Sequence, residues 1–150
     1  MVTHISHSPE ETEALGEEWG RAAQSGLVIG LSGDLGAGKT QLAKGIARGL
    51  GISGRVHSPT FTLVNEHTGG RLTLFHVDLY RLKNAGQIAA AGLEEYFQPA
   101  GVSVIEWAER AFPIGASAGE PLPLPARFRR VNIETLSETA RRITYEDLGA

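Results

Sequence analysis

Residues 27–40 read LVIGLSGDLGAGKT, and this stretch decides the fold of the chain. It opens with an apolar run that is typical of a buried strand and then breaks into glycines. Its second half, from Gly33 to Thr40, matches G-x-x-x-x-G-K-[ST], the pattern of a phosphate-binding loop. Residues 41–50 carry apolar side chains at helical spacing and are followed by Gly51. The stretch therefore predicts a strand, a phosphate-binding loop and a helix in succession.

The chemistry of phosphate explains this spacing. A triphosphate needs hydrogen-bond donors on several sides, and backbone N–H groups supply them where no bulky side chain intervenes. Gly36 and Gly38 can adopt positive φ, which lets the backbone approach the phosphates. Lys39 can reach the β- and γ-phosphates, and the Thr40 hydroxyl can bind Mg²⁺. We expect nucleotide contacts from Asp34, Leu35, Gly36, Ala37, Gly38, Lys39, Thr40 and Gln41.

The composition restricts the class of protein. A chain of 150 residues suits one domain, and we expect a single domain over residues 1–150. The formal net charge of −3 argues against a protein that coats nucleic acid, and the lack of cysteine excludes disulfides and thiolate metal sites. No apolar run has membrane-spanning length and the N-terminus lacks a signal-peptide pattern, so we expect no membrane association and a cytoplasmic location.

The remaining patterns predict an α/β fold. Ser8, Pro9 and Glu11 form a capping-box pattern at the start of a helix over 9–24, and weak helical character over 83–97 is expected to break near Gly92. Strands are expected at 2–6, 60–67, 72–78 and 102–105 and in a terminal hairpin over 127–134 and 142–145, with a surface loop over 112–125. Together these elements favour a P-loop NTPase-like three-layer fold with a mixed, partly parallel central sheet.

Two apolar runs end in a carboxylate, at Asp78 and at Glu106. The C-terminal ends of parallel strands meet at the ligand edge of an α/β sheet, so both side chains are candidate catalytic residues. The alternative is that each is a solvated acid at a strand end. Thr40 and Glu106 are the candidate metal ligands, although the residues alone do not decide which carboxylate holds the metal and which positions water.

Other side chains are possible contributors to the same site. Thr60 lies in residues 58–62, where a P-loop protein often has a segment that senses the γ-phosphate, although strand threonines are also common. Trp107 is either a core residue or an aromatic lid beside a nucleotide. The histidines lack metal-ligand spacing, and His57 and His76 are expected to pack or hydrogen-bond at strand edges.

The absence of certain motifs bears on which nucleotide binds and which reaction follows. The guanine motif N-K-x-D is absent, which favours ATP. A small-molecule kinase is an alternative, but the segment over 112–125 has no arginine for a phosphate lid. Another alternative is a non-catalytic binding module that nucleotide gates. The two strand-end carboxylates argue against it. Fast hydrolysis needs an arginine that neutralises charge on the γ-phosphate. Arg55 and Arg81 are the nearest candidates in sequence, and neither is assigned to that role. We therefore expect slow hydrolysis that depends on partners.

Four segments together resemble the TsaE family, also called YjeE. They are SGDLGAGKT at 32–40, HSPTFTLVNEH at 57–67, FHVDLYRL at 75–82 and VIEWAER at 104–110. The resemblance implies a small bacterial P-loop ATPase, using ATP and Mg²⁺, of tRNA threonylcarbamoyladenosine (t6A) biosynthesis. It further implies that TsaD and TsaB are the protein partners and that tRNA is reached indirectly through their complex.

The resemblance also implies roles for individual residues. Lys39 and Thr40 correspond to the phosphate and Mg²⁺ contacts, and Thr60 belongs to the switch-like segment. Asp78 and Glu106 correspond to the essential carboxylates of the family. Trp107 corresponds to the aromatic residue beside the site.

Overall fold

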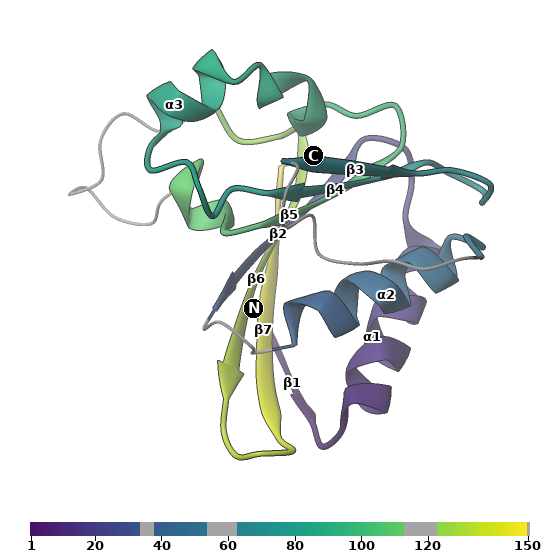
Figure 1. Ribbon diagram of the computed structural model, residues 1–150. Helices are drawn as coiled ribbons and strands as arrows, with labels where there is room; N and C mark the ends of the chain where they lie inside the picture. The colour runs from purple at the N-terminus through teal and green to yellow at the C-terminus, as the bar shows by residue number, and fades with distance from the viewer. Residues whose placement is uncertain (34–37, 54–62, 113–122, 150) are drawn as a thin grey trace.

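The computed structural model describes residues 1–33, 38–53, 63–112 and 123–149. Its centre is a seven-stranded sheet with the order β1-β7-β6-β2-β5-β4-β3 (Figure 1). The strands are β1 (Val2–Ser6), β2 (Leu27–Gly33), β3 (Val64–His67), β4 (Leu74–Asp78), β5 (Val102–Glu106), β6 (Arg127–Thr135) and β7 (Arg141–Gly149).

The middle of the sheet is parallel and its edges are antiparallel. Strand β2 pairs in parallel with β5 on one side and with β6 on the other, and β4 pairs in parallel with β5. Strands β3 and β7 run antiparallel to β4 and β6, and β1 runs antiparallel to β7. The predicted mixed, partly parallel sheet is therefore confirmed. The ends of β2, β4, β5 and β6 consequently meet at one edge.

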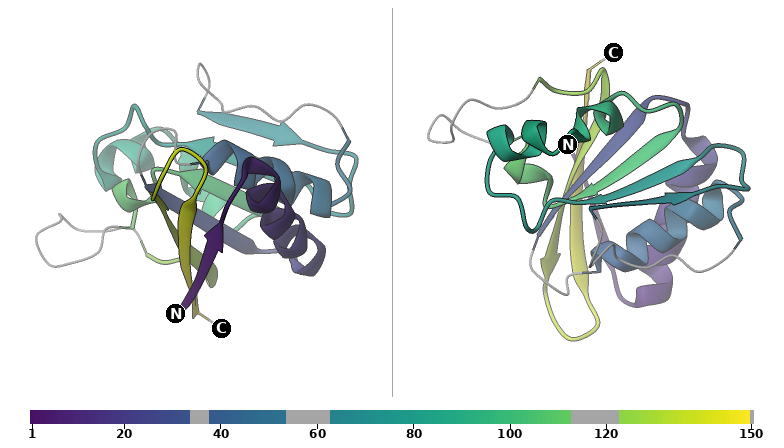
Figure 2. Two further views of the ribbon diagram at one scale, coloured as in Figure 1. Left: turned by 90° about the horizontal axis from the view of Figure 1, so that it is seen from below. Right: turned by 45° about the horizontal axis from the view of Figure 1, so that its top comes forward.

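Helices cover both faces of this sheet (Figures 1 and 2). Helices α1 (Pro9–Ala22) and α2 (Lys39–Gly49) cover one face, and α3 (Ala85–Ala90) and the 3₁₀ turns η1 (Leu93–Phe97) and η2 (Ala108–Arg110) cover the other. Side chains alternate along β2, so Ile29 and Leu31 join the core under α1 and α2 while Val28 joins the core under α3. The three-layer prediction is confirmed.

Helix α1 begins as its capping pattern predicts. The Ser8 hydroxyl accepts a hydrogen bond from the Glu11 N–H at 3.1 Å, and Pro9 occupies the first turn. The Glu11 carboxylate accepts from the His7 N–H at 2.7 Å, one residue before the N-cap. The Glu11 N–H, which the helix itself leaves unpaired, is thereby satisfied, and the second bond fixes the backbone just before the helix.

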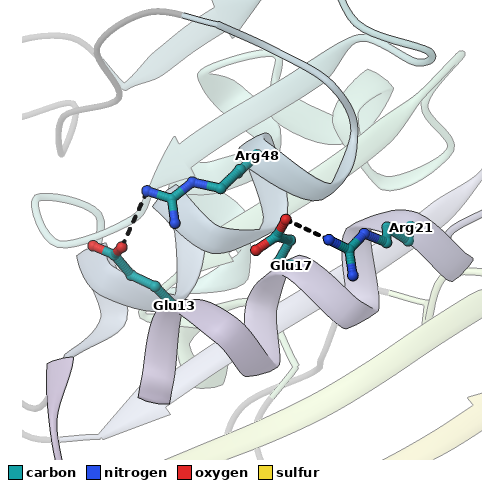
Figure 3. Close-up of polar contacts among 4 residues, drawn as sticks. All are labelled: Glu13, Glu17, Arg21 and Arg48. Atoms are coloured by element: carbon teal, nitrogen blue, oxygen red, sulfur yellow. Dashed lines mark hydrogen bonds and ion pairs between the residues drawn. The ribbon is translucent and has the colours of Figure 1, made fainter. Parts of the chain in front are cut away.

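Helices α1 and α2 contact each other through glycine. A Cβ added at Gly16 or Gly20 of α1 would overlap the carbonyl oxygens of α2, and one added at Gly45 or Gly49 would overlap those of α1. The two backbones are therefore in direct contact. Ion pairs border this contact, from Glu13 to Arg48 across the helices and from Glu17 to Arg21 along α1 (Figure 3), but their arginines are exposed and add little stability.

Some of the other predicted elements are confirmed, and others lie partly outside the described residues. The break near Gly92 is confirmed, since Gly92 adopts φ +76° between α3 and η1. The terminal hairpin is confirmed and is longer than predicted. Of the predicted strand over 60–67, residues 64–67 form β3 and 60–62 lie outside the described residues, as do 113–122 of the predicted loop. In the part of the chain that the structure describes, no helix is long and apolar enough to cross a membrane.

Candidate active site

A cleft of about 580 Å³ lies where the central strands end and α2 begins. Its volume is in the range of small-ligand pockets. It brings together seven of the predicted site residues with two groups that the sequence did not connect to them, the start of α1 and the β6–β7 turn. The lining residues are Pro9, Thr12, Gly38, Lys39, Thr40, Gln41, Asp78, Tyr80, Glu106, Trp107, Glu138, Thr139 and Arg141.

The phosphate-binding pattern lies at one end of this cleft. Gly38 has φ +100° and precedes α2 without a side-chain cap, so the first turn of α2 presents backbone N–H groups there. Lys39 is 4% exposed, and its Nζ donates to the Gly33 carbonyl at 3.1 Å. Asp34, Leu35, Gly36 and Ala37 lie outside the described residues.

The two predicted carboxylates are neighbours. Asp78 and Glu106 are register partners in the parallel pair β4–β5, and both line the cleft. Burial raises the pKa of Asp78 above its ordinary value; the hydrogen bond from the Tyr80 N–H lowers it in part, and the Glu106 carboxylate raises it again. Glu106 is 5% exposed, and Asp78 is half-buried. The prediction that the strand ends bring these side chains together is confirmed.

The prediction for His76 was right about hydrogen bonding and wrong about its place in the sheet. His76 hydrogen-bonds, as expected, but β4 lies inside the sheet and is not an edge. The His76 side chain is fully buried, and its Nε2 lies 2.6 Å from Oε2 of Glu106. The alternation of Leu74, His76 and Asp78 puts His76 on the same face of β4 as Asp78, which is the signal that the sequence contained. His57 lies outside the described residues, as does Thr60.

Trp107 forms an aromatic wall with Tyr80 and Arg110. Its ring lies 5.2 Å from that of Tyr80, and the Arg110 guanidinium stacks on it at 5.1 Å and donates to the Tyr80 carbonyl at 2.6 Å. Lys39 Nζ lies 4.1 Å from the centre of the Trp107 ring. Trp107 has φ +61°, a conformation that costs a non-glycine residue about 1–3 kcal/mol. The ring lies in the cleft lining and also packs against the core under α3, so it has features of both predicted alternatives.

The β6–β7 turn also reaches the cleft, which the sequence did not indicate. Because β6 runs parallel to β2, its C-terminal end lies at the same edge as the phosphate-binding pattern. The turn contributes Glu138 and Thr139 to the lining, and Arg141, the first residue of β7, adds to it. The Arg141 guanidinium donates to the Ser137 and Ala140 carbonyls at 2.7 and 3.0 Å, so it braces the turn. Arg81 is exposed and does not line the cleft, and Arg55 lies outside the described residues.

The donor set fits a magnesium ion that shares its ligands with phosphate. The described residues contain no cluster of three or more His, Asp or Glu side chains able to cage a metal. Mg²⁺ instead uses one or two carboxylates, waters and substrate phosphates. The Thr40 hydroxyl, Asp78 and Glu106, all lining the cleft, match that need.

Comparison with known proteins confirms the resemblance. Residues 6–143 match the family model for threonylcarbamoyl adenosine biosynthesis protein TsaE. The chain is 39% identical to the TsaE protein of Bacillus subtilis, across 95% of this chain and 83% of the relative, and 40% identical to that of Treponema pallidum, across 93% and 96%. The crystal structure of Bacillus subtilis YdiB matches with a TM-score of 0.77 at 34% identity, across 99% of this chain and 86% of YdiB. The chain therefore belongs to the TsaE family of tRNA threonylcarbamoyladenosine biosynthesis.

Proposed function

We propose that this protein binds ATP with Mg²⁺ in the cleft and hydrolyses it slowly, in support of tRNA threonylcarbamoyladenosine modification as a partner of TsaD and TsaB. The observation that supports the proposal most strongly is that Lys39, at the start of α2, and Glu106, at the end of β5, line one cleft. A buried lysine beside a helix N-terminus suits the phosphates, and the carboxylates suit the metal and the attacking water.

The site residues have four proposed roles: affinity for the nucleotide, sensing of the γ-phosphate, binding of Mg²⁺ and orientation of the attacking water. The loop over 34–41 and Trp107 would supply affinity for the nucleotide, and Thr60 would sense the γ-phosphate. Thr40 and Glu106 would hold Mg²⁺, which when bound offsets negative charge on the phosphates. Asp78 would orient the attacking water: it lies directly beside Glu106 in the register, and burial favours its accepting a proton.

Slow hydrolysis follows from how the arginines are used. In P-loop proteins an arginine at the γ-phosphate raises the rate by roughly 10³–10⁵-fold. Among the described arginines only Arg141 lines the cleft, and its guanidinium is bonded to carbonyls of its own turn. A partner protein is therefore the proposed source of the missing acceleration.

The test is steady-state ATP turnover of the pure protein, with and without TsaB and TsaD. We expect slow, Mg²⁺-dependent turnover that changes when both partners are added. Turnover of tens per second by the protein alone, unchanged by the partners, would contradict the proposal. A self-sufficient enzyme, such as a kinase assayed without its acceptor, would then be the better account.

A further inference from the structure

The buried side chain of His76 is hydrogen-bonded to Glu106, one of the proposed catalytic carboxylates. In the β4–β5 register His76 is opposite Val104 and Asp78 is opposite Glu106, so His76 and Glu106 are diagonal neighbours on one face of the sheet. That face is the one under α1 and α2, where Leu74 and Val104 join the core. The separation of 2.6 Å between His76 Nε2 and Glu106 Oε2 makes this contact a strong hydrogen bond.

The other ring nitrogen shows which way this bond runs. His76 Nδ1 is buried and has no hydrogen-bond partner among the residues that the structure describes. An unpaired lone pair costs less than an unpaired buried N–H, so the proton belongs on Nε2, and His76 donates to Glu106. A leucine of similar volume would leave no unpaired nitrogen in the core. Among the described residues, the hydrogen bond of the His76 ring is the one to Glu106, so the ring acts as a fixed donor at that carboxylate.

We infer that His76 is a positioning residue for ATP hydrolysis, holding Oε2 of Glu106 so that the carboxylate keeps one orientation in the cleft. This inference rests on the proposed function. A carboxylate at the end of a strand can rotate about its side-chain bonds, and fixing one oxygen removes most of that freedom. Groups that orient a metal ligand or catalytic acid in this way are typically worth about 10- to 100-fold in metal affinity or activity.

Three substitutions separate positioning from packing. In His76→Gln the side-chain amide can place an N–H where Nε2 lies, whereas in His76→Asn it reaches only the place of Nδ1. His76→Leu removes the donor and keeps the volume. We expect turnover to fall about 10- to 100-fold in the Asn and Leu variants, with the KM for ATP little changed, and to recover largely in His76→Gln. Urea unfolding identifies any variant that does not fold. If His76→Leu does not fold, the comparison of turnover between His76→Gln and His76→Asn tests the inference.

A second readout uses no nucleotide. The Nε2 proton, buried and bonded to a carboxylate, should give a slowly exchanging downfield proton NMR signal in the free protein. We expect the signal to be absent in His76→Leu and to move upfield or vanish in Glu106→Ala. Three results would each overturn the inference. One is equal turnover in His76→Leu and the unchanged protein, and another is an equal loss of turnover in the Gln and Asn variants. The third is an NMR signal that Glu106→Ala does not change. If the unchanged protein does not hydrolyse ATP, alone or with partners, the proposed function fails, while the NMR signal still tests the contact.

Discussion

Asp78 and Glu106 end adjacent parallel strands and stand opposite each other in the register. Two acids are thereby held side by side at the edge of the sheet where α2 begins. Burial, the Glu106 charge and the Tyr80 N–H act on Asp78, and His76 hydrogen-bonds to Glu106. The resulting electrostatic cost can be measured.

The first prediction concerns stability and pH. The pKa of Asp78 is raised by burial, so ionised Asp78 destabilises the folded state at neutral pH. Asp78→Asn should therefore increase the free energy of unfolding at pH 7.5, by less than about 1 kcal/mol because the side chain is only half-buried. Below the ordinary pKa of an aspartate the acid is protonated in both states, so the gain should shrink as the pH falls toward 4. Urea unfolding at several pH values measures it.

Asp147 is the matched control with the opposite sign. Hydrogen bonds from Arg129 lower the pKa of Asp147. The stabilisation by ionised Asp147 is therefore complete above the ordinary pKa of an aspartate, and it is lost as the pH falls through the lowered pKa of the folded state. Asp147→Asn should slightly decrease stability at pH 7.5. A loss of stability in Asp78→Asn at pH 7.5, or a gain independent of pH, would show that burial of the Asp78 charge is not the cause.

The second prediction concerns the contact between α1 and α2. Alanine is normally the better helix former, but a Cβ at Gly45 would overlap the Glu13 carbonyl oxygen. Gly45→Ala should cost about 1–3 kcal/mol of stability, since the two helices must separate. It should also weaken nucleotide binding, because α2 carries Lys39. Gly86→Ala is the control: its Cβ would meet only the Asn84 side-chain oxygen at 3.3 Å, and we expect a change within about 0.5 kcal/mol. Similar costs for both substitutions would rule out the close helix contact as the reason.

The third prediction concerns Lys39. Lys39→Ala should weaken ATP binding strongly, because it removes the buried cation at the proposed phosphate end of the cleft. Since Lys39 Nζ lies 4.1 Å from the Trp107 ring, nucleotide binding should change tryptophan fluorescence, which provides the titration signal. Lys44→Ala, in the same helix but outside the cleft lining, should leave the affinity unchanged. Equal affinities of the Lys39 and Lys44 variants would contradict the assignment, and Trp107→Phe checks that the signal does not come from Trp19.

Local patterns were enough to predict the layers of the fold and several of the residues that line the cleft. The phosphate-binding pattern placed Lys39 and Thr40 at the start of a helix, and strand-end position alone placed Asp78 beside Glu106. These predictions succeed because each depends on neighbours in the chain or on the general rule for parallel strand ends.

The features that were missed all depend on contacts distant in sequence. His76 meets Glu106 only because β4 pairs with β5, which hydrophobic alternation does not specify. Arg141 reaches the cleft only because β6 pairs in parallel with β2, and nothing near Arg141 marks that pairing. The glycines at 16, 20, 45 and 49 look like weak helix positions until the two helices are seen in contact.

The central claim is that Glu106 acts on hydrolysis more than on binding of ATP. The most direct measurement compares nucleotide affinity and single-turnover hydrolysis of Glu106→Gln with the unchanged protein, with exposed Glu94→Gln as the control. Because a positioned catalytic group acts mainly on the transition state, we predict affinity within a few-fold and hydrolysis reduced by roughly 100-fold or more in Glu106→Gln only. Full hydrolysis by the folded Glu106→Gln variant would contradict the account.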